Sequence, residues 1–220
     1  METQTKGYKG LGMEGGIARW YAKLTRKSLP EFEQLAQRMA AGLSPGARVL
    51  EVAPGPGYFS VALAKLGNFD ITGLDVSKTF VEIARNNARE AGVSVDFQQG
   101  NASRMPFANE RFDLILCRAA FKNFSEPVKA LAEMRRVLRP GGRTIIIDLR
   151  RDTPQQEINR HIDAMNVGSV NATLMKWTFR CMLLKRAYTR EEFERMIAEA
   201  GWQKHEIGEA PVGFEITLTK

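Results

Sequence analysis

Short apolar runs alternate with amphipathic stretches along the middle of the chain. The runs have the length and the residue types of buried strands, whereas the stretches between them place apolar residues at helical spacing. The predicted strands cover residues 48–52, 70–76, 93–100, 112–120 and 143–150. The two clearest helices cover 78–92 and 127–138, and the second stops at Arg139-Pro140-Gly141-Gly142, a strong breaker. This alternation predicts a parallel sheet with helices on both faces.

The end of the chain departs from this alternation. Two strand-like segments, 202–209 and 213–219, are separated only by a short link around Ala210-Pro211. Strands joined so closely must be antiparallel neighbours, because a parallel connection needs a long crossover. The predicted fold is therefore α/β: a Rossmann-like, doubly wound sheet of seven strands, mostly parallel, with an antiparallel C-terminal hairpin.

The domain organisation follows from length and from two helical regions. A chain of 220 residues suits one domain. Ahead of the first strand, apolar residues from Phe32 to Ala40 recur at helical spacing, and residues 152–186 after the fifth strand are also helical in pattern. We predict a single domain over 1–220, with an N-terminal helical cap over 1–42 and a helical lid insertion over 152–186.

Composition narrows the class of protein. Hydrophobic residues make up 44% of the chain and charged residues 26%, as in ordinary globular domains. No apolar run approaches the length of a membrane span, and the N-terminus lacks the apolar core of a secretory signal. Cys117 and Cys181 form no CxxC pair, so neither a disulfide framework nor a metal site is expected. We expect a cytoplasmic protein.

The net charge of +7 raises the question of an anionic partner. Lysines and arginines are spread along the chain and mixed with acidic residues, and they cluster only in pairs such as Arg135-Arg136 and Arg150-Arg151. This pattern is typical of a solvated basic surface. We therefore expect no nucleic-acid partner, and the sequence leaves the oligomeric state open.

Candidate chemistry begins in the loop after the first strand, within "EVAPGPGYFS" (51–60). Strand, glycine-rich loop and helix in this order usually hold a phosphate on backbone N–H groups. Here Pro54 and Pro56 remove two donors, and Ser60 stands where the dinucleotide fingerprint GxGxxG has its third glycine. Gly55 and Gly57 still allow close approach of a ligand. Such a loop favours a ligand that carries no phosphate.

Asp75, at the end of the second predicted strand, points to the other half of that ligand. It follows Gly55 by 20 residues, the interval at which a carboxylate accepts from the hydroxyls of an adenosine ribose. An adenosine compound whose other end is an amino acid meets both observations. We therefore predict S-adenosyl-L-methionine as the cofactor.

Four segments resemble class I S-adenosylmethionine-dependent methyltransferases, in order and at matching spacing. They are "VLEVAPGPGYFSVALAK", "ITGLDVSKTFVEIARNNA", "GNASRMPFANERFDLILCRAAFKNF" and "ALAEMRRVLRPGGRTIIIDLR". Within that family the chain most resembles the small-molecule branch that includes the ubiquinone/menaquinone-biosynthesis methyltransferases. The resemblance is strong over residues 46–150 and weak over the closing hairpin. It implies an enzyme that transfers a methyl group to a small molecule by in-line displacement.

The resemblance also implies which residues hold the cofactor. The methionine end and the transferred methyl would lie against Tyr21, Glu51, Ala53, Pro54, Gly55, Gly57 and Arg118. Asp75 would bind the ribose, and the adenine would lie against Val76, Asn101 and Ala102. Two positions depart from the family pattern, because Ala53 stands where glycine is usual and Asn101 where aspartate is usual. An amide oxygen can still accept from the adenine amine.

The acceptor side carries weaker signals. His161, on the predicted lid, is the histidine best placed to act as a general base, and Asp148 and Lys122-Asn123 follow strands at the same edge. "CRAAFKNF" lacks the Asn/Asp-Pro-Pro-Tyr/Phe motif of many enzymes that methylate nucleobase amino groups. The apolar lid favours a small apolar or aromatic acceptor. Residues 175–188 mix basic and apolar side chains, which is compatible with peripheral contact with a membrane.

Other functions remain open from the sequence alone. A nicotinamide-dependent oxidoreductase uses a similar sheet, although the missing third glycine and the antiparallel hairpin argue against it. A non-catalytic binding or regulatory protein could keep the cofactor fold. An RNA-modifying methyltransferase could use the positive charge.

Overall fold

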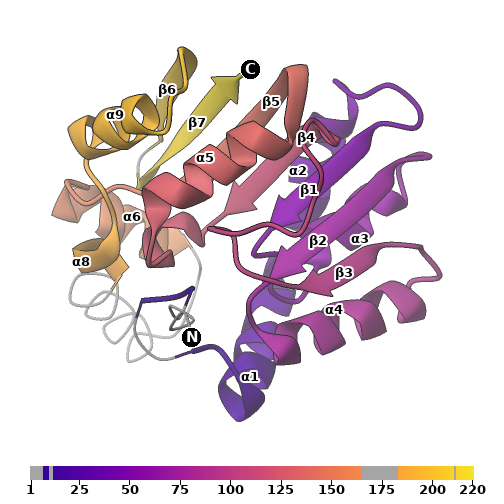
Figure 1. The fold of residues 1–220 in the computed structure, drawn as a ribbon. Helices are drawn as coiled ribbons and strands as arrows, with labels where there is room; N and C mark the ends of the chain where they lie inside the picture. The colour runs from indigo at the N-terminus through magenta and orange to yellow at the C-terminus, as the bar shows by residue number, and fades with distance from the viewer. Residues whose placement is uncertain (1–6, 10–11, 165–182, 211) are drawn as a thin grey trace, which may run out of the picture.

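The computed structural model describes residues 7–9, 12–164, 183–210 and 212–220. Within these ranges seven strands form one sheet in the order β3-β2-β1-β4-β5-β7-β6 (Figure 1). The strands are β1 (Arg48–Val52), β2 (Asp70–Asp75), β3 (Asp96–Gln99), β4 (Phe112–Arg118), β5 (Leu138–Leu149), β6 (Lys204–Ala210) and β7 (Gly213–Thr219). Strands β1 to β5 pair in parallel, and β7 is antiparallel to both β5 and β6. The predicted fold class and C-terminal hairpin are confirmed.

Helices cover both faces of the sheet. α2 (Leu29–Ala40) and α3 (Tyr58–Ala64) pack on one face, and α5 (Pro127–Val137) and α9 (Arg190–Glu199) pack on the other. Successive residues of β1 divide between the two faces, since Val49 belongs to the α2–α3 cluster and Leu50 to the α5–α9 cluster. Strands covered on both faces must be apolar throughout, which explains the continuous apolar runs in the sequence.

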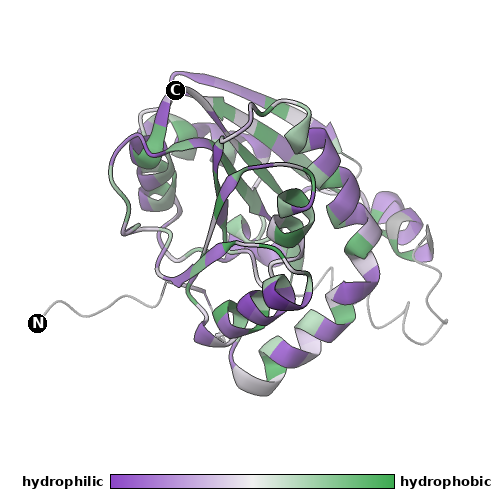
Figure 2. Cartoon of the chain, turned by 90° about the vertical axis from the view of Figure 1, so that its right-hand side faces the viewer, coloured by the Kyte–Doolittle hydropathy of each residue, from purple (hydrophilic) through white to green (hydrophobic). Residues whose placement is uncertain are grey.

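Hydropathy follows this layering. Figure 2 shows hydrophobic residues concentrated in the strands at the centre and hydrophilic residues interspersed along the outer helices. α4 (Lys78–Glu90) packs Val81, Ala84 and Ala88 against Phe97 of β3. Across the described residues, no helix combines the length and the apolar character that crossing a membrane requires.

Local signals explain where several helices begin. Ser77 Oγ accepts the N–H of Phe80 at 3.1 Å and caps α4. Thr189 and Glu192 form a reciprocal capping box at the start of α9. Pro127 lies at the start of α5, where its missing N–H costs nothing. The Ser77 cap and the proline at the start of α5 explain why α4 and α5 begin where the sequence predicts.

The predicted break at Arg139-Pro140-Gly141-Gly142 is wrong in one respect. It ends α5 as expected, but β5 already begins at Leu138, which pairs with Phe112, and the register shifts just beyond this pair. Gly141 has a φ of 76° and donates its N–H to the Lys220 carbonyl at 2.8 Å. The breaker is thus an irregularity inside β5, held by the far end of the chain, and a local pattern could not reveal this contact.

The predicted cap and lid regions contain further helices. α1 (Gly15–Thr25), the 3₁₀ helix η1 (Arg26–Ser28) and α2 fall within residues 1–42. α6 (Gln155–Ala164) and α8 (Leu184–Arg186) fall within residues 152–186, where Ile158, Ile162 and Leu184 form a small buried cluster. The middle of the predicted lid, 165–182, lies outside the described residues, together with most of the basic and apolar segment 175–188.

Candidate active site

The carboxyl ends of the central strands meet where the strand order reverses. The chain runs outward from β1 through β2 to β3 on one side and from β4 to β5 on the other (Figure 1). In open parallel sheets this switch point is where ligands bind. Ala53, Asp75 and Arg118 stand at or just after the ends of the neighbouring strands β1, β2 and β4, so the fold brings these three predicted residues to one edge.

The loop after β1 turns through three residues with positive φ. The φ angles are 56° at Ala53, 55° at Gly55 and 76° at Gly57. A Cβ on Gly55 would have no atom within 4 Å, so this residue borders open space. A Cβ on Gly57 would lie 2.6 Å from the ring of Phe97, so core packing requires glycine there. The open side of the loop is therefore at Gly55.

Both prolines of the loop serve the fold. A Cβ on Gly73 would stand 3.2 Å from Cγ of Pro54, so the proline ring packs closely over β2. The Pro56 carbonyl accepts from Nδ2 of Asn87 at 2.8 Å, which ties the loop to α4. The prolines therefore stiffen a loop whose shape is set by its neighbours.

The Asp75 carboxylate is bound to this loop. Its Oδ2 accepts the N–H of Gly55 at 3.0 Å, and its Oδ1 accepts the N–H of Ser77 at 2.9 Å. Asp75 is 5% exposed, and burial raises its pKa to about 6 despite both bonds. Each carboxylate oxygen has more than one lone pair and can accept a further hydrogen bond. A ligand that donates hydroxyls here would stabilise the charged form.

Glu51, inside β1, is a second buried acid. Ser60 donates to its Oε2 from Oγ at 2.5 Å and from its backbone N–H at 3.2 Å. Burial raises the pKa of Glu51 to about 7, although Ser60 and the charge of Arg118 act in the opposite direction. Ser60 occupies the position where a dinucleotide loop has glycine, and here its hydroxyl binds Glu51. The loop is therefore built around acidic groups.

The surface beyond Asp75 suits an apolar ring. Val76 is 40% exposed, and its carbonyl accepts from Nε2 of Gln99 at 3.2 Å. Oδ1 of Asn101 accepts the N–H of Ser103 at 2.9 Å, and Gly7 lies against this amide, since a Cβ on Gly7 would stand 2.9 Å from its oxygen. Ala102 is buried in the core. The three predicted adenine-contact residues thus follow β2 and β3 at the same edge.

Tyr21 reaches this edge from α1. Its ring packs edge-to-face on Phe80, with ring centroids 5.8 Å apart. Burial raises the pKa of the Tyr21 hydroxyl, Arg118 lowers it, and Asp148 and Asp75 raise it further. The N-terminal cap therefore brings an aromatic side chain into the electrostatic field of the site.

Arg118 is held by the cap as well. Its Nη2 donates to Oε2 of Glu31 at 3.0 Å, and its guanidinium lies 4.3 Å from the ring centroid of Phe32. Both partners belong to α2, which no local motif connects with the end of β4. The contacts fix the direction of Arg118, and its charge still acts on Glu51 and Tyr21.

Lys122 and Asp148, which the sequence predicts near the acceptor, form a buried ion pair. Lys122 lies in the 3₁₀ helix η2 (Phe121–Asn123), and its Nζ donates to Oδ1 of Asp148 at 2.8 Å and to the Ala119 carbonyl at 2.6 Å. The Asp148 Oδ2 accepts the backbone N–H of Lys122 at 2.8 Å. Asp148 is thus engaged with Lys122, not held free as a base. His161 lies on α6, its side chain is outside the described residues, and its role stays a prediction.

The segment before α1 also contributes, although no sequence pattern predicts it. The N–H of Lys9 donates to the Asn123 carbonyl at 2.7 Å, and the Glu14 carboxylate accepts the N–H groups of Lys78 and Thr79 at 2.9 and 3.1 Å. A carboxylate is favoured at the N-terminus of a helix such as α4. The segment links the loop after β4 to α4, and its partners lie too far along the chain to form a readable motif.

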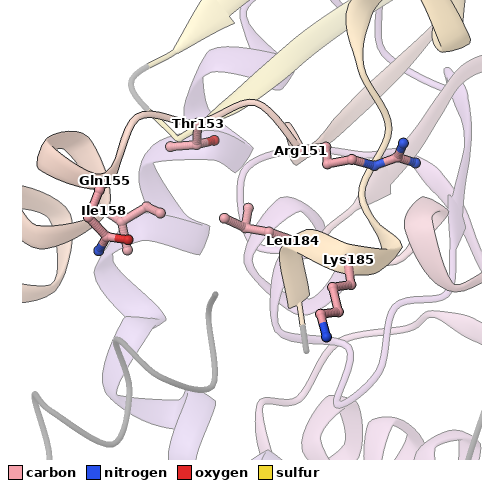
Figure 3. A pocket seen from close by; sticks show the side chains of 6 residues that line it. All are labelled: Arg151, Thr153, Gln155, Ile158, Leu184 and Lys185. Carbon is pink, nitrogen blue, oxygen red and sulfur yellow. The ribbon is translucent and has the colours of Figure 1, made fainter. Parts of the chain in front are cut away.

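A pocket lies beside α6 and α8. It is lined by Arg151, Thr153, Gln155, Ile158, Leu184 and Lys185. Figure 3 shows Ile158 and Leu184 pointing toward each other, whereas Lys185 points away. Thr153 donates its hydroxyl to the Arg150 carbonyl at 2.7 Å. The lining residues Arg151 to Ile158 follow β5 directly, within the region predicted to cover the acceptor.

The residues at the switch point fit S-adenosylmethionine. Glu51 and Asp75 are acids whose charged forms are penalised by burial, so a cationic ligand gains by lying near them. Gly55 leaves room beside the loop, and Val76 offers apolar surface. Within the described ranges, no group of three or more His, Cys, Asp or Glu residues could hold a metal ion.

Comparison with known proteins agrees with this geometry. Residues 50–146 match the family model described as a methyltransferase domain. The chain is 37% identical over 102 residues to the demethylmenaquinone methyltransferase of Deinococcus radiodurans, which covers 46% of this chain and 42% of that protein. It is 29% identical over 154 residues to the ubiquinone/menaquinone biosynthesis C-methyltransferase UbiE of Shewanella pealeana, which covers 68% and 56%. The chain thus spans about half the length of these curated relatives.

The fold has solved counterparts. A protein from Methanococcus maripaludis superposes with a TM-score of 0.77 over 96% of this chain and 95% of that chain, at 23% identity. At this identity the likeness establishes the fold alone. Together with the matched family model, it confirms the resemblance that the sequence motifs indicate. Residues 50–146 match a methyltransferase domain, and the chain resembles the class I S-adenosylmethionine-dependent methyltransferases, among them the ubiquinone/menaquinone-biosynthesis enzymes.

Proposed function

We propose that this chain is an enzyme that transfers a methyl group from S-adenosyl-L-methionine to a small apolar or aromatic acceptor. The observation that carries the proposal is the pair of buried acids, Glu51 and Asp75, around a loop that is open at Gly55. Such a site favours a cation joined to an adenosine. The names of the relatives, which concern quinone biosynthesis, support an aromatic acceptor.

Each part of the cofactor has candidate partners at the sheet edge. Asp75 accepts from the ribose hydroxyls while it keeps its bonds to the loop. Asn101 accepts from the adenine amine, and Val76 covers the ring. The loop from Ala53 to Gly57 and the acid Glu51 lie on the methionine side, where Tyr21 closes the site from the cap.

The chain contributes positioning more than covalent chemistry. Bound S-adenosylmethionine supplies a methyl group on a positively charged sulfur. Transfer of such a group is an in-line displacement, so the residues must align the acceptor and exclude water. The Lys122–Asp148 pair holds the Ala119 carbonyl and thereby fixes the loop after β4 on the acceptor side. His161 is the proposed base for an acceptor that must lose a proton.

The same proposal covers the organisation and location of the protein. We take residues 1–220 as one domain, with residues 1–42 as a cap and 152–186 as a lid over the acceptor. The cytoplasm is the proposed location, and peripheral contact with a membrane is compatible with the basic and apolar residues of the lid.

The alternatives receive no support from the site. A nicotinamide dinucleotide needs a diphosphate cradle, and the third glycine of that cradle is replaced by Ser60, whose hydroxyl binds Glu51. An RNA substrate needs a basic track, whereas the loop after β1 is bordered by buried acids. No specific observation favours a non-catalytic role.

A methyl-transfer screen tests the proposal. The purified protein is mixed with S-adenosylmethionine and a panel of apolar aromatic acceptors, including demethylated quinones, and formation of S-adenosylhomocysteine is measured. We expect turnover with at least one aromatic acceptor and none with RNA. Turnover with RNA but with no small molecule would contradict the proposed substrate class.

A further inference from the structure

One face of α1 carries large apolar side chains that the other described residues leave half exposed or more. Ile17, Trp20 and Leu24 are 50%, 64% and 49% exposed. Their spacing of three and four positions places them on one stripe of the helix, which we call the α1 stripe. Among the described residues only Leu66 and Val76 are other large hydrophobic residues with comparable exposure, and Val76 lies at the adenine side of the site.

The α1 stripe is not the face that holds the helix in place. Ala18 and Ala22 are the buried residues of α1, and the Ala22 carbonyl accepts from the hydroxyl of Tyr58 at 2.8 Å. Tyr21 packs on Phe80 of α4. The helix is therefore held in place through these other residues, and the side chains of the α1 stripe remain exposed on its outer face.

The charged residues of α1 and of the short segment after it have one sign. No acidic residue occurs between Gly15 and Pro30, whereas four exposed basic residues occur there: Arg19, Lys23, Arg26 and Lys27. At helical spacing, Lys23 and Arg19 lie on the solvent side next to Trp20. The nearest acids along the chain are engaged elsewhere, since Glu14 binds the N-terminus of α4 and Glu31 binds Arg118.

This combination matches the surface of an anionic bilayer. A helix that lies in a membrane interface carries Trp and aliphatic residues on one face and Lys or Arg beside them. Indole rings favour the headgroup level, and basic side chains extend their charges to the lipid phosphates. A second copy of this chain fits less well, because a two-fold contact through the α1 stripe would bring the same cations together.

We propose that α1 docks the protein on an anionic lipid bilayer through Ile17, Trp20 and Leu24, with Arg19 and Lys23 contacting the headgroups. The docked helix also carries Tyr21, which reaches the sheet edge. If the proposed function holds, the site lies beside the phase in which an apolar acceptor dissolves. The docking itself depends only on α1 and is testable without turnover.

Co-sedimentation with vesicles tests the docking. Vesicles of phosphatidylcholine mixed with phosphatidylglycerol are compared with vesicles of phosphatidylcholine alone, using the full chain. We expect binding to the anionic vesicles that weakens as salt is added. Arg19→Gln with Lys23→Gln should weaken binding about fivefold per charge removed. Trp20→Gln should weaken it about tenfold by removing the largest apolar anchor.

Leu66→Gln is the matched control, because Leu66 is 45% exposed and lies outside α1. It should bind vesicles as the wild type does. S-adenosylmethionine affinity, measured on every variant, should stay unchanged and so separates this proposal from the proposed function. The proposal is overturned if the wild type ignores anionic vesicles, if the α1 variants bind as well as Leu66→Gln, or if Trp20→Gln only dissolves a dimer that does not bind lipid.

Discussion

The two sides of the sheet edge are built in different ways. On the cofactor side, Asp75 is bound by Gly55 and by Ser77, all placed by the regular pairing of β1 with β2. On the proposed acceptor side, Lys122 in the segment after β4 donates to Asp148 near the end of β5. The first side rests on a local motif, and the second on side-chain contacts between distant parts of the chain. The contacts of Asp75 are thus set by two neighbouring strands and their loops, whereas the contact of Lys122 joins segments that lie 26 residues apart.

The largest effect on stability is expected from removing one partner of the Lys122–Asp148 ion pair. Lys122→Met leaves Asp148 charged and buried with no cation, which should lower the free energy of unfolding by about 3–5 kcal/mol. Urea denaturation measures this loss. Lys122→Met combined with Asp148→Leu should recover much of it, because no buried charge remains. Equal loss in the single and double variants would show that packing, and not the ion pair, matters there.

The next largest effect is expected on cofactor affinity, when the charge of Asp75 is removed. Asp75→Asn removes the charge that accepts from the ribose, and charge-assisted hydrogen bonds contribute about 1.5–3 kcal/mol each. We expect S-adenosylmethionine affinity to fall roughly tenfold to a hundredfold. Calorimetry measures the affinity, with Asp70→Asn at the exposed start of β2 as the control. Unchanged binding in Asp75→Asn would remove this residue from the site.

The raised pKa values of Glu51 and Asp75 predict a pH dependence for the cofactor side. Burial raises them to about 7 and about 6, so the ligand-free folded protein binds these protons more tightly than the unfolded chain does. The stability that this proton binding gives to the folded state is fully present below pH ~4, where the two acids titrate in the unfolded chain. It is lost as the pH rises through their folded pKa values of about 6 and about 7. Thermal unfolding of the ligand-free protein should therefore show this loss.

Affinity for the cationic cofactor should change in the opposite direction. It should rise with pH over the same window, because the ionised acids attract the ligand. Glu51→Gln should remove the upper step and leave the step of Asp75. Calorimetric titration across that window measures both steps. A flat profile in the wild type would mean that neither acid faces the ligand.

The smallest effect on stability is expected at two alanines with positive φ, one in the loop after β1 and one after β4. Ala53 and Ala119 have φ angles of 56° and 58°, in a region that costs a non-glycine residue about 1–2 kcal/mol. Replacing either by glycine should raise stability by up to about 1 kcal/mol, because glycine loses part of the gain to chain entropy. Ala132→Gly, at an exposed position inside α5, should lower stability by about 1 kcal/mol. A loss of stability in Ala53→Gly would mean that its methyl group packs usefully.

The fold could be predicted because its signals are local. Covered strands are continuous apolar runs, Ser77 and Thr189 mark helix starts, and the short link between the last two strands fixes their direction. The break before β5 was predicted incorrectly, since the Lys220 carbonyl that holds Gly141 is not encoded nearby. A local pattern indicates which secondary structure a segment favours. It cannot indicate which distant segment forms hydrogen bonds with it.

The candidate site divides along the same line. The loop after β1 and Asp75 were accessible from spacing and from the resemblance to a family. The role of Glu14 as a cap of α4, the hold of α2 on Arg118 and the pairing of Lys122 with Asp148 were not, because each joins segments that no motif connects. Gly57 is readable from the motif, but the structural reason for it is different. A Cβ at this position would collide with the Phe97 ring, so packing and not the ligand requires glycine there.

The most direct test of the central claim is a pair of calorimetric titrations of the wild-type chain, one with S-adenosylmethionine and one with NAD. S-adenosylmethionine should bind at one site per chain, Asp75→Asn should weaken this binding, and NAD should not bind. Tight binding of NAD with no binding of S-adenosylmethionine would contradict that claim.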